Sequence, residues 1–209
     1  MAKFFKSVWF KCIFSLLAIA LVSGGILSVL NNVLYVSPAE RTARAMKKVY
    51  GTEITVQTEN IVLDTDSTDA TVNKTAIVNE YGSINKIYII GDALTDKYDK
   101  VFQATGYEGY KGGTITLWVK IVYENGNAKN IDTVVLETFD KQTLMSKLGD
   151  AFYKKFTYAE FVDEYTSGKI FTSDSKNTEG IKNVVTGASK SANAGCNAVN
   201  CIIAYVWGN

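Results

Sequence analysis

A short run of small residues near the C-terminus, Thr186-Gly187-Ala188-Ser189-Lys190-Ser191, has the composition of a phosphate-binding segment. It precedes apolar residues at helical spacing, among them Val199 and Ile202, so it opens the last helix of the chain. Helix N-termini carry unpaired backbone N–H groups and partial positive charge, which favour a phosphate. Gly187 lets a ligand approach the backbone closely, and Ser189 places a hydroxyl at the phosphate position. The alternative interpretation is an ordinary Ser/Thr helix cap.

With Asn183 added, this run resembles the flavinylation motif of FMN-binding domains, as Asn183-x-x-Thr186-Gly187-Ala188-Ser189-x-Ser191. These domains occur in the G subunit of Rnf complexes and the C subunit of sodium-translocating NADH:quinone oxidoreductases. The resemblance implies that FMN is joined covalently, through its phosphate, to the Ser189 hydroxyl by a flavin transferase that uses FAD. The family usually has Asp and Thr where this chain has Asn183 and Ser189, and Ser keeps the required hydroxyl.

A second segment of the family pattern, Glu-Thr-Pro-Gly-Leu-Gly, lines the flavin site and resembles the stretch that begins at Gln142-Thr143 and ends at Leu148-Gly149. An alternative register uses Glu137-Thr138. The resemblance therefore implies a set of cofactor-binding residues: Ser189 (covalent FMN phosphoester), Thr186, Gly187, Ala188, Ser191, Thr143 and Gln142. From periodicity alone, the same stretch is an amphipathic helix with Leu144, Leu148, Ala151 and Phe152 inward.

Composition excludes several other functions. The chain has 209 residues, 47% of them hydrophobic and 21% charged, with a net charge of +1, which gives no indication of nucleic-acid binding. The sequence contains no His, which excludes a Ser-His-Asp triad and a His-bearing zinc site. Its three cysteines are scattered, and Cys196 and Cys201 point to different sides of the last helix, so we predict buried cysteines and no metal site.

The N-terminus has the properties of a transmembrane helix. The uncharged run from Cys12 to Leu30 spans about 28 Å as a helix, close to the thickness of a bilayer core. Lys3, Lys6 and Lys11 precede it without an acidic residue, which favours a cytoplasmic N-terminus and an extracytoplasmic domain. A cleaved signal peptide is the alternative. We therefore expect an anchor over residues 1–36 and one domain over residues 37–209.

The pattern of the remaining residues predicts an α+β fold: one domain of antiparallel strand-turn-strand units with packed helices. Helix signals begin at Ser37-Pro38 and stop at Gly51, and Asn125-Gly126 marks a hairpin. The other elements expected are strands over 54–62, 77–90 and 114–123, and helices over 92–104, 142–156 and 158–166. The glycine-rich segment 106–113 is expected to be mainly a turn, although the family often has such a segment before this strand.

The resemblance implies a membrane-anchored flavoprotein that carries electrons, and not a self-contained enzyme. The first expectation is an electron-transfer subunit of an Rnf-type complex, which moves electrons between ferredoxin and NAD and couples this to ion transport. Its partners would be the other membrane subunits and the flavin transferase. One alternative is a stand-alone FMN carrier of extracellular electron transfer. The other is a non-redox, membrane-anchored binding or surface domain that uses Thr186 to Ser191 only as a cap.

Overall fold

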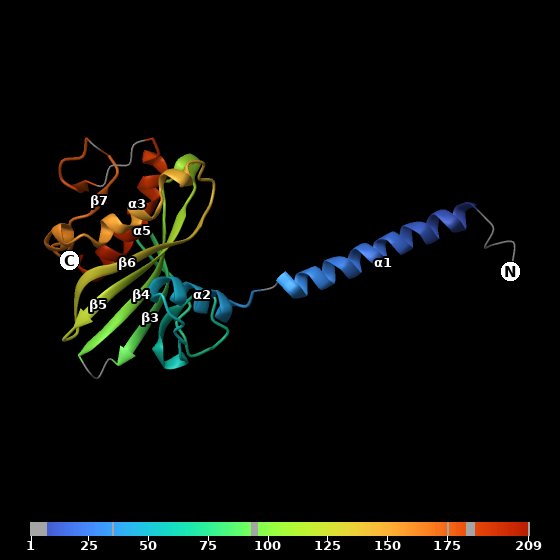
Figure 1. The fold of residues 1–209 in the computed structure, drawn as a ribbon, viewed down its shortest axis with the longest axis horizontal. Coiled ribbons are helices and arrows are strands. Elements are labelled where there is room, and N and C mark those ends of the chain that lie inside the picture. The colour runs from blue at the N-terminus through green and yellow to red at the C-terminus, as the bar shows by residue number, and fades with distance from the viewer. Residues whose placement is uncertain (1–7, 35, 93–95, 175, 183–186, 209) are drawn as a thin grey trace. The chain divides into compact units, whose positions relative to one another are not determined.

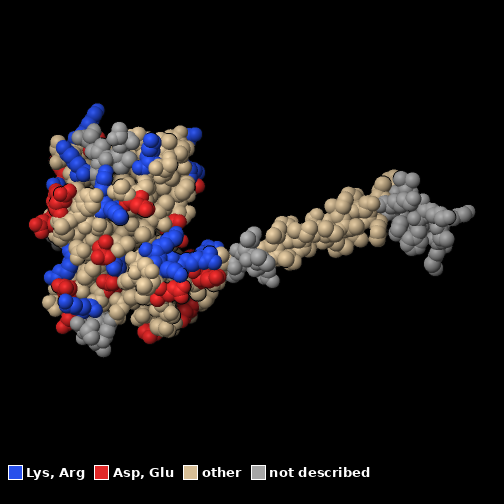
Figure 2. Space-filling model, viewed as in Figure 1, with Lys and Arg blue, Asp and Glu red and all other residues tan. Residues whose placement is uncertain are grey.

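The computed structural model describes residues 8–34, 36–92, 96–174, 176–182 and 187–208. The chain divides into two compact units, Met1–Glu40 and Arg41–Asn209. The first contains the helix α1 (Val8–Leu34), in which Cys12–Leu30 has a mean hydropathy of 2.5 and exposed side chains throughout. Figure 2 shows no Lys, Arg, Asp or Glu among the described side chains of this helix. The prediction of a helix long and apolar enough to cross a membrane is confirmed.

The second unit is built on a six-stranded antiparallel sheet with strand order β1-β3-β4-β5-β6, in which β2 also pairs with β3 (Figure 1). Its strands are β1 (Ile61–Asp64), β2 (Ile77–Val78), β3 (Gly82–Asp92), β4 (Lys97–Gly106), β5 (Ile115–Glu124) and β6 (Asn127–Phe139). The β5–β6 hairpin turns at Asn125 and Gly126, whose φ angles are 51° and 75°. Two consecutive residues with positive φ match the twist of the flanking strands, which is why Asn-Gly predicts this turn.

Both faces of the sheet are covered by helices. On one face, α5 (Ser189–Val206) buries Val199 and Ile202 in a core with Phe102 and Leu117. The short helices α3 (Asp150–Lys154) and α4 (Val162–Thr166) complete this layer. On the other face, α2 (Pro38–Tyr50) buries Met46 in a second core. The predicted α+β fold with an antiparallel sheet is therefore confirmed. The predicted motif lies at the N-terminus of α5, a helix that packs against this sheet.

Several short elements connect these layers. They are the 3₁₀ turns η1 (Thr58–Asn60), η3 (Tyr110–Gly112), η4 (Met145–Lys147), η5 (Lys155–Thr157) and η6 (Ala159–Phe161), and the parallel pair β7 (Phe171–Thr172) and β8 (Ile181–Lys182). The expected helix over 142–156 is instead broken into η4, α3 and η5. Leu148 and Phe152 are buried as predicted, but Leu144 and Ala151 are exposed, because the break between η4 and α3 changes the helical phase.

The helix expected over 92–104 is wrong: residues 97–106 form the central strand β4. Val101 packs toward α2, whereas Phe102 and Ala104 pack toward α5, so this strand is buried on both faces. A strand with two apolar faces loses the alternation that distinguishes it from a helix. The strand expected over 54–62 is confined to Ile61–Asp64, preceded by η1.

Candidate functional site

The predicted flavin-attachment residue, Ser189, is the first residue of α5, and its side chain is exposed. Ala188, buried at 5% exposure, immediately precedes the helix, and no side-chain hydrogen bond caps this end among the described residues. Gly187 has a φ of 83°, and a Cβ built there would meet no atom of a described residue within 4 Å. Thr186 and Asn183 lie outside the described residues. In the described part of the motif, Ser189 therefore lies in the first turn itself and not at the capping position.

Gln142 joins the two segments that the sequence singled out. Its Oε1 accepts hydrogen bonds from the Ser191 hydroxyl at 2.8 Å and from the Tyr110 backbone N–H at 3.1 Å. Its Nε2 donates to the Asp140 carbonyl at 2.9 Å. Gln142 and Ser191 are both buried, so the bond between them is shielded from water, whereas the bonds to Tyr110 and Asp140 are only partly buried. The side chain thus connects the end of β6, the glycine-rich segment and the first turn of α5, and we call this set of contacts the Gln142 clamp.

The glycine-rich segment packs closely against both Gln142 and α5. A Cβ at Gly109 or Gly113 would lie 2.4 or 2.5 Å from Gln142 Nε2, and one at Gly106 would lie 2.0 Å from the Ala194 carbonyl oxygen of α5. Only glycine fits at such distances, because real Cβ atoms do not approach other heavy atoms so closely. The expectation of a simple turn was therefore incomplete: the segment is a close-packed wall along the start of α5.

Three polar side chains that the sequence reasoning missed hold the same region. Asn197 donates to the Tyr107 carbonyl at 3.0 Å, and Asn193 donates to the Glu108 carbonyl at 3.3 Å. Ser173 donates to the Ser189 carbonyl at 3.1 Å. The two asparagines are four residues apart on α5, so they share one face of the helix. That spacing was the one signal in the sequence that could have indicated their role. Together with the Ser173 bond, these contacts hold the first turns of α5 in place.

The remaining predicted positions separate the two possible registers. Thr143 is exposed beside Gln142 in the chain. In the alternative register, Glu137 accepts a hydrogen bond from the Trp118 indole at 2.8 Å, and Thr138 is exposed on β6. Of these four residues, Gln142 is the one whose side chain bonds to a described residue of α5. The Gln142-Thr143 register therefore brings the second segment to the motif.

The electrostatics of this helix start suit an anion. The first turn of α5 contains no acidic residue, and Lys190 is exposed beside Ser189. A regular α-helix leaves the N–H groups of its first turn without carbonyl partners within the helix, and their partial positive charge favours a phosphate. Within the described residues, no group of three His, Cys, Asp or Glu side chains is arranged to hold a metal ion. The described residues fit a phosphate ester on Ser189, and none of them fills the space beside the Gly187 Cα.

Comparison of the chain with family models, curated proteins and solved structures finds no match. The fold and the helix start described above are therefore the observations from which function is inferred.

Proposed function

We propose that this chain is a membrane-anchored electron carrier that bears FMN covalently on Ser189. One observation carries the proposal: the Gln142 clamp joins two sequence segments that resemble the same flavin site, at an exposed serine in the first turn of a helix. Two resemblances separated by about forty residues gain weight when a buried hydrogen bond connects them. A helix cap alone explains neither the exposure of Ser189 nor the close-packed glycine wall.

Attachment requires only a hydroxyl nucleophile and a phosphate acceptor. In the proposed step, the Ser189 oxygen forms a bond to the phosphorus of the FMN half of FAD, and the pyrophosphate bond breaks. AMP leaves with the electron pair of that bond, and the flavin transferase removes the serine proton. Because the sequence contains no His to act as a general base, we assign the catalytic groups to the transferase. The chain supplies an accessible hydroxyl and a backbone arranged to hold the phosphate.

A bound flavin supplies one- and two-electron transfer, and the protein supplies tethering and orientation. Tethering has a clear advantage for a domain outside the cytoplasm, where free cofactor would be lost. The apolar span Cys12–Leu30 supports a single membrane anchor, and Lys3, Lys6 and Lys11 before it favour a cytoplasmic N-terminus. We propose that the chain serves as the G-type subunit of an Rnf-type complex, with the other membrane subunits as redox partners. A stand-alone carrier would give the same modification without co-purifying subunits.

The test is flavin transfer to the full chain in detergent, with a purified flavin transferase and FAD. We expect covalent flavin fluorescence in the denatured band, with release of AMP in equal amount. Ser189→Ala abolishes both, and Ser189→Thr retains them, because Thr keeps the hydroxyl. Ser167→Ala is the matched control, since it removes an exposed hydroxyl that lies outside both segments of the proposed flavin site. Labelling of the Ser189→Ala variant would contradict the proposed attachment site.

A further inference from the structure

A groove between the edge strand β6 and α3 indicates a second site. Its lining residues are distant in sequence from the motif around Ser189. The groove has a volume of about 760 Å³ and is lined by Val134 and Leu136 of β6, Leu148, Tyr153 and Lys154 of the α3 region, and Lys48 of α2. Ligand sites for small organic molecules commonly have volumes of about 300–1,000 Å³ with mainly apolar walls. Leu148 ends the second segment that resembles the flavin site, but none of the proposed cofactor-binding residues lines this groove.

The wall of the groove contains a buried hydroxyl without a partner. Tyr153 is only 5% exposed, and its hydroxyl makes no hydrogen bond to any described residue. Leaving a buried donor unsatisfied destabilises the folded state, so native proteins rarely retain one without a reason. Burial and the nearby Asp150 carboxylate raise the pKa of Tyr153 to about 12, so the group is a neutral donor at physiological pH. It requires an acceptor atom.

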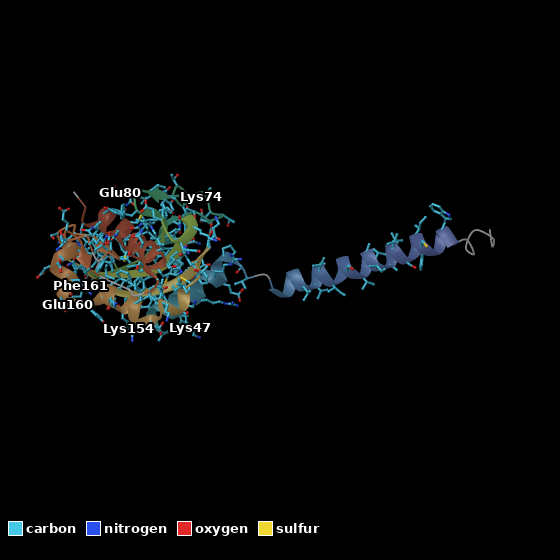
Figure 3. The ribbon with its side chains drawn as sticks, turned by 90° about the horizontal axis from the view of Figure 1, so that it is seen from above. Lys47, Lys74, Glu80, Lys154, Glu160 and Phe161 are labelled. Atoms are coloured by element: carbon cyan, nitrogen blue, oxygen red, sulfur yellow. The ribbon has the colours of Figure 1, made fainter. Side chains whose placement is uncertain are left out.

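The charges at the rim favour an anion. Lys48 and Lys154 are exposed, and neither has an ion-pair partner among the described residues. The rim also carries two carboxylates, Asp132 and Asp150. Asp132 is paired with Lys120 at 2.7 Å, so Asp150 is the rim carboxylate without an ion-pair partner among the described residues. Figure 3 shows Lys154 and Lys47, the neighbour of Lys48, on the same side of the domain. Lys47 differs from both rim lysines because it is paired with Glu53 at 2.9 Å.

We propose that this groove binds a small organic anion with a flat apolar body, whose oxygen accepts a hydrogen bond from Tyr153 and whose charge is held by Lys48 and Lys154. The apolar body lies against Val134, Leu136 and Leu148. Tyr153 reaches the bound oxygen by a small movement of the wall, which gives the buried hydroxyl its missing acceptor. The proposal does not depend on the flavin, because it rests on different residues.

The test uses two probes with the same ring system, naphthalene-2-carboxylate and its neutral amide, naphthalene-2-carboxamide. Binding to the full chain in lipid nanodiscs is measured by calorimetry, with empty nanodiscs as the blank. We expect one site, with the carboxylate bound more tightly than the amide. Tyr153→Phe weakens both probes about tenfold, which corresponds to one lost hydrogen bond. The double variant Lys48→Met/Lys154→Met weakens only the carboxylate, and Lys47→Met leaves both affinities unchanged.

The folding stability of Tyr153→Phe provides a second readout, which is expected to stay unchanged or to rise while the affinity for the probes falls. Without a ligand, removal of an unsatisfied hydroxyl leaves the melting temperature unchanged or raises it, because no hydrogen bond is lost. Lower affinity with unchanged or higher stability supports the site. The proposal is overturned if neither probe binds at millimolar concentration, if the tyrosine and lysine variants bind both probes like the unmodified chain, or if Tyr153→Phe lowers the melting temperature.

Discussion

Removal of the Gln142 side chain is expected to release the first turn of α5 from the rest of the site. Gln142→Ala deletes the acceptor of the Ser191 hydroxyl and the Tyr110 N–H, and the donor to the Asp140 carbonyl. Ser191 is 3% exposed, so its hydroxyl cannot turn to bulk water. Tyr110 and Asp140 are more accessible, and water replaces part of what they lose. The clamp therefore contributes through one buried and two partly solvated hydrogen bonds.

The magnitude follows from this division. Loss of a partner for the buried hydroxyl costs about 1–3 kcal/mol, and each of the two partly solvated bonds contributes about 0.5–1 kcal/mol, so Gln142→Ala destabilises the domain by about 2–5 kcal/mol. A domain of this size then melts roughly 4–20 °C lower. The assay is urea unfolding of the full chain, followed by the fluorescence of Trp118, which is buried in the core beneath α2.

Two further variants make this prediction falsifiable. Thr143→Ala is the matched control, because the adjacent residue is exposed and its loss changes stability by less than about 0.5 kcal/mol. Ser191→Ala combined with Gln142→Ala costs less than the sum of the single changes, since both remove the same bond. If Gln142→Ala is no more destabilising than Thr143→Ala, or if the two clamp variants are additive, the clamp does not hold the helix start.

The remaining predictions concern the glycines and the cysteines of this layer. Gly106→Ala destabilises the domain by at least about 2 kcal/mol in the same urea assay, because its Cβ would overlap the Ala194 carbonyl. Gly187→Ala costs only about 1 kcal/mol, from its positive φ alone, and equal costs for the two variants would contradict this packing. Cys196 and Cys201 are buried and free, so neither reacts with a thiol reagent until the domain unfolds; reaction of the folded domain at either residue would show that α5 is not packed as described. Burial also raises the pKa of the Cys196 thiol from about 9 to about 12. The contribution of the neutral thiol to stability is therefore complete below pH 9 and is lost as the pH rises toward 12. Cys196→Ala should flatten the fall of the melting temperature at alkaline pH, and an unchanged slope would refute this.

The sequence predicted the elements that local chemistry determines. Asn125-Gly126 predicted the hairpin because two positive φ angles are needed there, and Ser37-Pro38 and Gly51 predicted the limits of α2. It could not predict β4, because a central strand lies between two apolar layers and its pattern is ambiguous. It also could not predict that Tyr153 would be buried without a partner, since that depends on where distant groups lie.

The candidate site divides in the same way. The motif itself predicted the start of α5 at Ser189, because small residues before an apolar run indicate a helix start. The resemblance added Gln142, and its contact with Ser191 joins positions 49 residues apart, which no local pattern encodes. Asn193 and Asn197 were missed because asparagines on a helix face indicate a polar surface as readily as a bond to a neighbouring loop.

The central claim is covalent FMN on Ser189, and intact mass of the chain purified from its native membrane tests it most directly. The account predicts a mass increase of one FMN minus water, localised by proteolysis to the peptide that contains Ser189. An unmodified mass, in cells that also produce an active flavin transferase, would contradict it.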